Sequence, residues 1–490
     1  MDILELDDIQ GYIIRGYAHL QYSRFVILKI TGAGSARQWL GTIVDDITPA
    51  THVHDKSKLS NTSLNIAFTS AGLAKLGMEK DNVDSFNLEF REGMVTPHRQ
   101  RILGDFGASD PAHWNWGNNS DDSTHLVLMI FGRNKETCLD YYEKLKQQYT
   151  NHGLQEHRRF DGQTLPKNKE HFGFRDGISQ PVIEGSGRQG AATNTVKAGE
   201  FILGYKNEYK VFPDSPLIVK DQGNTNLLPA DAAGSGLKDL GKNGSFLVIR
   251  QMQQHVDRFW NFMNNKTLND DGTINELEST RLAAKMMGRW PGGAPLTKFA
   301  DTDPGNESDD NDFGYAKEDE EGLKCPIGSH LRRCNPRDSF EDDSSKKSVT
   351  LSNRHRIIRR ARLYGDPFAG SPLNTTPKGE VGLLFNCFNS DISRQFELIA
   401  HTWANSTKTK NLYDDPDPII GVIDYNFKDN LADPPRVFRQ KVQEVPPQNF
   451  TIQSCPVNKT IKGLERFVTI RGGAYFFFPS ITAIRYLSTI

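Results

Sequence analysis

Three polar segments of the chain carry side chains whose types and spacing could do chemistry. The first, His171–Pro181, reads HFGFRDGISQP and has Gly173 and Gly177 on either side of Asp176. Glycines at these positions allow a tight backbone that presents the Asp176 carboxylate from an otherwise apolar setting. Asp-Gly is also common in ordinary turns. Taken alone, the segment therefore indicates either an acid–base carboxylate or a structural turn.

The second segment, Cys325–Arg337, places one histidine among several arginines. His330 lies in a short helix-like turn, and three arginines follow it closely in the chain: Arg332, Arg333 and Arg337. This set suits a buried iron porphyrin, because the imidazole can ligate iron and the guanidinium groups can bind the two propionates. A lone histidine is more often a satisfied polar residue of the core or the surface, so that alternative stays open.

The third segment, His355–Gly365, places Arg359 directly after Ile357 and Ile358. The apolar pair indicates the end of a strand, which would deliver an arginine into the interior. Read by itself, the segment also looks like a basic patch for nucleic acid. The whole chain carries 59 Lys and Arg against 61 Asp and Glu, a net charge of −2. A balance this close to neutral disfavours a nucleic-acid binder, whose affinity depends on clustered positive charge.

Short apolar strands, each followed by a polar turn and an amphipathic helix, recur along the chain and would position these segments. They lie at residues 25–28, 64–67, 126–131, 245–249, 381–385 and 474–478. Continuous apolar runs of this length are typical of strands buried under helices. The pattern predicts an α+β fold with one cluster of strands before about residue 170 and another after about residue 240.

Composition narrows the class of protein further. A chain of 490 residues predicts two or three domains. No apolar stretch approaches the 18 or so residues that a membrane-spanning helix needs. None of the five cysteines stands in a CxxC or CxxCH motif, so neither a zinc ribbon nor covalent haem attachment is indicated.

The expected compartment follows from weaker signals. The first residues lack the basic region and apolar run of a secretory leader. Sequons nevertheless recur in polar, turn-like contexts, at Asn61, Asn306, Asn374, Asn405 and Asn458. We therefore expect an extracellular protein, with a cytoplasmic one as the alternative.

Together the three segments resemble the dye-decolorizing (DyP-type) haem peroxidase family, in its longer fungal-like branch. Gly173–Gly177 matches the GxxDG signature, Cys325–Arg337 is similar to the axial-histidine segment, and Arg354–Gly365 resembles the distal-arginine segment. Further similar stretches run from Asp8–Gly11 to Gly472–Pro479, so the resemblance spans nearly the whole chain. It implies two ferredoxin-like α+β modules, placed at residues 1–170 and 171–490, with haem held in the second.

The resemblance implies a peroxidase that uses hydrogen peroxide to oxidise dyes, phenols and other aromatic donors. Asp176 would act as acid and base on the peroxide, and Arg359 would stabilise the charge that develops as the O–O bond breaks. Trp403 and Tyr364 resemble family residues implicated in long-range electron transfer from bulky donors. The alternative for both aromatic residues is core packing.

The resemblance also implies one non-covalent haem b per chain. His330 would ligate its iron, and Asp417 would hold the other ring nitrogen of His330. Arg332 and Arg333 are the expected partners of the propionates.

One departure from the family pattern affects the third segment. Ala361, Arg362 and Leu363 stand where the family commonly has Gly-Ile-Pro. Two adjacent arginines, at 359 and 360, then compete for the distal role, and counting back from Tyr364 and Gly365 favours Arg359. The departure also affects the shape and charge expected for the access channel.

Other functions stay open at this point. The acidic residues at 301–343 are a candidate Mn(II) site, although a solvated loop is the simpler interpretation. A haem carrier or iron-handling protein of the same fold is one rival to the peroxidase. A haem-free secreted binding protein, with the Asp and Arg segments serving as turns, is another. The sequence does not predict an oligomeric state.

Overall fold

Nine β-strands form one antiparallel sheet that closes into a barrel. The computed structural model describes residues 3–51, 59–118, 120, 122–340, 345–422 and 448–490. Within them the strands follow the order β10-β12-β11-β4-β1-β3-β2-β15-β9, and β12 also pairs with β9, which closes the sheet. The strands are β1 (Tyr22–Ile30), β2 (Thr62–Phe68), β3 (Leu126–Gly132), β4 (Leu154–Gln163), β9 (Ser245–Gln254), β10 (Ile358–Arg359), β11 (Arg362–Tyr364), β12 (Gly382–Asn389) and β15 (Val468–Phe478).

The barrel consists of two four-strand units with the same internal order. In the first, the spatial order is β4-β1-β3-β2; in the second, it is β11-β12-β9-β15, read from the opposite edge as fourth, first, third, second. This is the ferredoxin-like arrangement twice, so the predicted α+β fold is confirmed. The units join where Leu363 pairs with Gln163 and where Phe477 pairs with Phe68. The division of the chain into modules at residue 170 stays a prediction.

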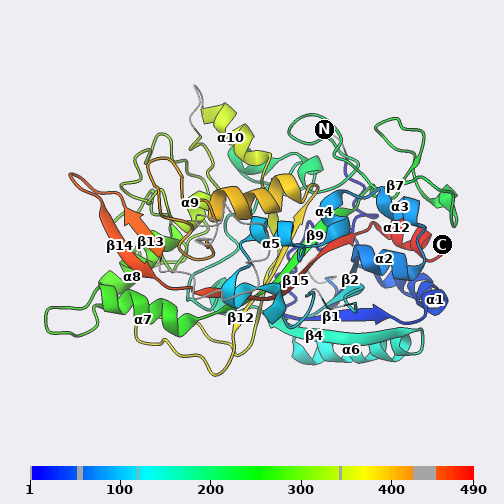
Figure 1. The fold of residues 1–490 in the computed structure, drawn as a ribbon, viewed down its shortest axis with the longest axis horizontal. Helices are drawn as coiled ribbons and strands as arrows, with labels where there is room; N and C mark the ends of the chain where they lie inside the picture. The colour runs from blue at the N-terminus through cyan, green and yellow to red at the C-terminus, as the bar shows by residue number, and fades with distance from the viewer. Residues whose placement is uncertain (1–2, 52–58, 119, 121, 341–344, 423–447) are drawn as a thin grey trace, which may run out of the picture.

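The helices cover the barrel along its length and at both ends. Helices α1, α2 and α12 lie at one end of the long axis, and α7 and α8 lie toward the other (Figure 1). The α-helices are α1 (Ala33–Ile43), α2 (Ser70–Leu76), α3 (Lys80–Asp84), α4 (Leu88–Glu92), α5 (Pro97–Leu103), α6 (Lys135–Thr150), α7 (Val256–Lys266), α8 (Glu276–Met287), α9 (His330–Cys334), α10 (Ser345–Asn353) and α12 (Ile481–Leu487). Two consecutive π-helical segments, Ser393–Glu397 and Ile399–Ala404, follow β12.

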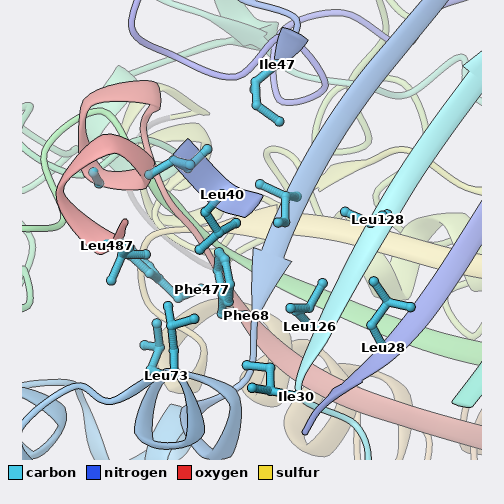
Figure 2. Packing of buried hydrophobic residues seen from close by; sticks show 14 of the residues in the cluster. Leu28, Ile30, Leu40, Ile47, Phe68, Leu73, Leu126, Leu128, Phe477 and Leu487 are labelled. Carbon is cyan, nitrogen blue, oxygen red and sulfur yellow. The ribbon is translucent and has the colours of Figure 1, made fainter. Parts of the chain in front are cut away.

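Both faces of the central strands are buried, which explains why they read as continuous apolar runs. On β1 and β3 the even-numbered residues Leu28, Leu126 and Leu128 pack under helices, together with Leu40 of α1 and Leu73 of α2 (Figure 2). The odd-numbered residues of the same strands point into the barrel, as expected for side chains that alternate along a strand. The sequence predicted the helix-covered face but not the closed interior.

The barrel interior is filled by the N-terminal segment of the chain. Tyr12 and Tyr17 stack at 5.7 Å, and both rings contact Phe131 of β3. The hydroxyl of Tyr12 donates to the carbonyl oxygen of Arg360, which lies between β10 and β11. The interior packing therefore fixes the backbone exactly where the third chemical segment crosses the barrel wall.

A third apolar cluster lies outside the barrel and supports the site. Phe172 and Phe174 pack there against Phe259 and Trp260 of α7. The Trp260 indole Nε1 donates to the carbonyl oxygen of Phe172 at 3.0 Å. This contact ties the loop that contains the first chemical segment to helix α7.

The end of strand β9 sets the start of helix α7. Helix α7 begins only at Val256, because β9 continues to Gln254 and pairs there with Val468. Among the described residues, no helix combines the length and the apolar character needed to cross a membrane.

The long connections between barrel strands contain short two-stranded sheets. These pair β5 (Val182–Ile183) with β6 (Thr195–Val196), β7 (Leu217–Ile218) with β8 (Lys238–Asp239), and β13 (Gln448–Ile452) with β14 (Lys459–Leu464).

Candidate active site

A cavity of about 260 Å³ lies between the outer face of the second four-strand unit and the loops that cover it. All three chemical segments reach it, through Asp176, His330 and Arg359. Most of its wall is apolar and comes from the barrel strands, the loop after β4 and the π-helical segments: Phe172, Phe174, Met252, Leu383, Phe385, Phe396, Ile399, Ile419 and Val468. A largely apolar cavity with a few convergent charged groups is typical of a cofactor site.

The loop that carries Asp176 is held by a partly buried glutamate. The Glu170 carboxylate accepts hydrogen bonds from the backbone N–H groups of Phe172 and Phe174, both at 2.9 Å. The side-chain amide of Gln254, at the end of β9, donates to the same carboxylate at 2.6 Å. Burial raises the pKa of Glu170 to about 7. These hydrogen bonds anchor the loop to the barrel wall at the end of β9.

Asp176 forms an ion pair with Arg359 at the cavity. The Arg359 Nη1 donates to Asp176 Oδ1 at 2.9 Å, and the backbone N–H of Gly177 donates to the same oxygen at 2.6 Å. Burial favours the neutral acid, but the charge of Arg359 and the Gly177 amide hold the pKa of Asp176 below its usual range. The carboxylate therefore stays ionised in a mostly apolar setting.

The barrel wall separates the two competing arginines. The Arg360 guanidinium donates into the barrel, to the carbonyl oxygens of Tyr12, Ile13 and Ile14. The backbone N–H of Arg359 donates to the Gln180 side chain at 2.9 Å, and its guanidinium faces the cavity. Adjacent residues of a strand point to opposite faces, so only one of the two arginines can reach the cavity. The residue that reaches it is Arg359.

His330 is the first residue of α9, and a buried carboxylate fixes its ring. Nδ1 of His330 lies 2.8 Å from Oδ2 of Asp417, which is fully buried. The other Asp417 oxygen accepts from the backbone N–H groups of Ile419 and Ile420, at 2.9 and 3.0 Å. Burial favours protonation of Asp417, but His330 and these amides lower its pKa. With Nδ1 engaged, Nε2 is the ring nitrogen left to bind a metal.

The cationic groups of the cavity fit a dianionic porphyrin. Arg289 and Arg356 line it, and neither forms an ion pair with a carboxylate of the described residues. Arg289 donates to the carbonyl oxygens of Gly293 and Asp310, and its buried Nε has no partner. Burial lowers the pKa of Arg356 to about 9. Buried cations without counter-charges are costly, so two carboxylates entering the cavity would find partners already in place.

The contacts of Arg332 and Arg333 do not support the prediction that they bind the propionates. Arg332 lies 3.3 Å from Asp319 and over the Tyr315 ring, and Arg333 donates to the backbone carbonyl of Trp403. Neither lines the cavity. Residues two and three positions after His330 project from other sides of the helix, which proximity in sequence does not reveal. Arg289 and Arg356 were missed; Arg356 belongs to the third segment, but nothing in the sequence distinguished it.

The two candidate electron-transfer residues lie in different surroundings. Tyr364, in β11, is only 9% exposed, does not line the cavity, and donates its hydroxyl to Glu380 at 3.0 Å. Trp403, in the second π-helical segment, is partly exposed and lines a separate cavity of about 350 Å³. Its ring centroid lies 5.5 Å from that of His355. Trp403 therefore has access to solvent, whereas Tyr364 is part of the core.

The acidic loop expected as a Mn(II) site uses its carboxylates in ion pairs. Asp309 pairs with Arg175 at 2.9 Å, and Asp310 pairs with Lys298 at 2.7 Å. In the described part of the chain, the one group of three or more His, Cys, Asp or Glu side chains that could hold a metal is His330, Cys334 and Asp417. Residues 341–343 of the expected site lie outside the described residues. The structure thus gives the Mn(II) prediction no support.

Comparison with known proteins decides the family. Residues 8–166 match the model of the DyP dimeric alpha+beta barrel domain. Peroxidase 2 of Mycetinis scorodonius is 30% identical over 98% of this chain and 87% of its own length, and a dye-decolorizing peroxidase of Mycena epipterygia is 28% identical over 99% and 87%. The chain belongs to the dye-decolorizing peroxidase family. An ancestral D-type dye decolorizing peroxidase superposes with a TM-score of 0.78 at 27% identity, covering 100% of both chains.

Membership settles the class of reaction. The chain is a peroxidase, an oxidoreductase that reacts with hydrogen peroxide and a reducing substrate, and members of this family are haem enzymes. The predicted recognition and enzyme class are therefore confirmed. Which residues of this dye-decolorizing peroxidase carry the reaction is a separate question.

Replacing Gly173 by alanine should disrupt the loop that presents Asp176. Gly173 has φ +94°, and a Cβ there would lie 2.1 Å from the carbonyl oxygen of Gly370. Gly177, with φ +85° and no atom within 4 Å of the added Cβ, is the matched control. We expect Gly177→Ala to cost about 1–2 kcal/mol of stability, the price of a left-handed alanine, and Gly173→Ala to cost clearly more. Thermal unfolding measures both; equal losses would contradict the close approach.

Proposed function

We propose that this dye-decolorizing peroxidase binds one haem b non-covalently in the cavity lined by His330, Asp176 and Arg359. The observation that carries the proposal is the convergence of these three side chains, from segments far apart in the sequence, on one mostly apolar cavity. Nε2 of His330 would ligate the iron, and Arg289 and Arg356 would bind the propionates. The haem supplies the iron that exchanges electrons with hydrogen peroxide.

Asp417 acts through His330 in this proposal. By accepting a hydrogen bond from the Nδ1–H group, it fixes the tautomer and the orientation of the imidazole and makes Nε2 a more basic ligand. Its own charge is stabilised by the two backbone amides of Ile419 and Ile420. Asp417 is thus a positioning residue rather than one that touches the reactants.

Asp176 and Arg359 would act on the peroxide. The ionised Asp176 accepts a proton from one peroxide oxygen and returns it to the oxygen that leaves as water. Arg359 remains cationic at any working pH and stabilises the negative charge that develops as the O–O bond breaks. The 2.9 Å ion pair supports this assignment, because it keeps the base ionised and places the cation beside it.

The ion pair also favours an enzyme over a haem carrier of the same fold. A carrier needs the iron ligand and the propionate partners but has no use for a second, partly buried charge pair. Holding Asp176 and Arg359 partly away from bulk water costs desolvation free energy that haem binding alone does not require. The haem-free binding protein considered from the sequence is disfavoured by the buried cations Arg289 and Arg356.

Bulky donors need another route, since the cavity lies behind the covering loops. Trp403 fits a surface relay, because it is partly exposed and lines its own cavity. Its backbone carbonyl also accepts a hydrogen bond from Arg333, on the helix that begins with His330, at 2.7 Å. Tyr364 is a weaker candidate because it is buried in the core. An extracellular location and the oligomeric state stay predictions.

The pH dependence of the peroxide step tests the acid–base assignment. Because the pKa of Asp176 is held below its usual range, kcat/KM for hydrogen peroxide should fall only below about pH 4. Asp176→Asn should lower kcat/KM about 100- to 10,000-fold above that pH, since the proton acceptor is lost, and should remove the acid limb itself. Arg359→Gln removes the charge that depresses this pKa, so the acid limb should move to higher pH.

Controls separate this chemistry from misfolding. Asp310→Asn removes a surface carboxylate of the neighbouring loop and should leave the profile unchanged. An unaltered Soret band in each variant would show that haem still binds. Wild-type turnover by Asp176→Asn, or an acid limb that Arg359→Gln leaves in place, would contradict the assignment.

Removing Trp403 should separate large donors from small ones. Trp403→Ser is expected to depress the oxidation of an anthraquinone dye while sparing a small phenol that can enter the buried cavity. Tyr364→Phe keeps the core packing and serves as the comparison, with little effect expected on either donor. The measurement is kcat/KM for both donors at saturating peroxide. Equal losses on dye and phenol in Trp403→Ser would rule out a relay at this residue.

A further inference from the structure

A second cavity, of about 580 Å³, adjoins the first on the side of the catalytic pair. The two share five lining residues: Glu170, Asp176, Ile178, Arg359 and Leu383. Its remaining lining comes from the N-terminal segment around Ile14–His19, from the loop after β4, and from β10 and β11. Arg188 lines it and is exposed, so the cavity extends from the surface of the molecule to Asp176 and Arg359.

The lining of this second cavity is strongly cationic. It contains six basic side chains against three carboxylates: Arg15, Lys169, Arg188, Arg359, Arg360 and Arg362 against Glu170, Asp176 and Asp309. The carboxylates are already engaged. Asp176 pairs with Arg359, Asp309 pairs with Arg175, and Glu170 accepts backbone and amide N–H groups.

The other cations lack a carboxylate partner in the described part of the chain. Arg360 and Arg362 donate to backbone carbonyl oxygens of the N-terminal segment, including those of Tyr12 and Gly16. Arg15 and Arg188 have neither an ion pair nor a side-chain hydrogen bond to a described residue. Arg188 lies close enough to Arg15 and Arg360 to lower the pKa of each, although burial is the larger cause for both.

Part of this charge arises where the chain departs from its family. Ala361 and Arg362 line the cavity in the stretch that the sequence analysis set apart as a departure from the family pattern, and Arg362 adds a cation there. Apolar side chains continue the wall toward the catalytic pair: Ile14, Leu165, Ile178, Leu363 and Leu383. The cavity therefore combines an unpaired cationic mouth with an apolar inner part, within the size range of small-molecule sites.

We propose that the second cavity selects small aromatic donors that carry a carboxylate or sulfonate group. The anionic group binds Arg15 and Arg188, and the ring lies along the apolar wall toward Asp176 and Arg359. This assignment rests on the proposed function, because the bound molecule is the reducing substrate. Two phenolic donors each release one electron and one proton, and hydrogen peroxide takes up both electrons and both protons to give two molecules of water.

A matched pair of donors tests the proposal. Ferulate and its methyl ester carry the same phenol and differ in the charge of the carboxylate. Isothermal titration calorimetry on the holoenzyme without peroxide gives Kd for each, and steady-state kinetics gives KM and kcat. We expect ferulate to have the lower Kd and KM, with a preference that shrinks as ionic strength rises.

Charge-removing variants locate the site. The double variant Arg15→Gln and Arg188→Gln should raise Kd and KM for ferulate about tenfold while leaving the ester within about twofold. Arg188→Gln alone, at an exposed residue, guards against a folding defect and should show part of the effect. Arg133→Gln removes an exposed arginine outside both cavities and should change neither donor.

The outcomes distinguish the two proposals. If the double variant leaves ferulate binding unchanged, the charge-selective cavity is wrong, and peroxide-driven oxidation of both donors would show that the proposed function still holds. Inorganic phosphate should compete with ferulate but not with the ester, because the ester does not need the cationic mouth. Equal competition against both donors would also overturn the charge-selective cavity. Arginine-dependent ferulate binding without any turnover in the wild type would instead overturn the proposed function.

Discussion

A carboxylate and a guanidinium meet at 2.9 Å where β10 comes against the loop after β4, and the guanidinium helps to keep the carboxylate ionised in a mostly apolar setting. Their contact dictates much of the surrounding structure. The loop needs a residue with a positive φ at Gly173, and the hydrogen bonds of Glu170, to bring Asp176 to the barrel wall. The barrel needs its interior filled, so that the backbone around Arg360 is fixed and the side chain before it points outward.

A second charged contact, between His330 and Asp417, supports the segment Cys325–Arg337 in a similar way. A buried carboxylate is kept ionised by two backbone amides and by the imidazole it orients. Two buried cations that line the cavity, Arg289 and Arg356, have no carboxylate partner among the described residues. Charge balance inside the cavity is thus incomplete in the polypeptide alone, and it is completed by the two propionates of the haem that we propose to bind there.

The sequence predicted those parts of the site that depend on local pattern. The glycines around Asp176, the histidine at a helix start and the strand end before Arg359 are all visible in short stretches. The α+β class followed from the recurring strand and helix pattern. The closure of two sheets into one barrel did not, because it depends on edge pairs such as Phe68 with Phe477, which are about 400 residues apart.

The predictions that the contacts do not support, for Arg332, Arg333 and Mn(II), have a physical explanation as well. Arg332 and Arg333 are near His330 in sequence, but the turn of α9 directs them to Asp319 and to backbone carbonyls instead. Arg289 follows α8 as an isolated residue, so only folding brings it to the cavity. The Mn(II) expectation counted acidic residues without the basic partners, Arg175 and Lys298, that neutralise two of them.

The most direct test of the central claim is a titration of ferric haem into the apo form of the chain, followed by its Soret absorption. We expect one haem per chain and a changed axial-ligand spectrum in His330→Ala. The affinity for haem should be about 10- to 100-fold weaker in Asp417→Asn. A folded apo chain that binds no haem would contradict the central claim, as would a His330→Ala variant whose spectrum matches the wild type.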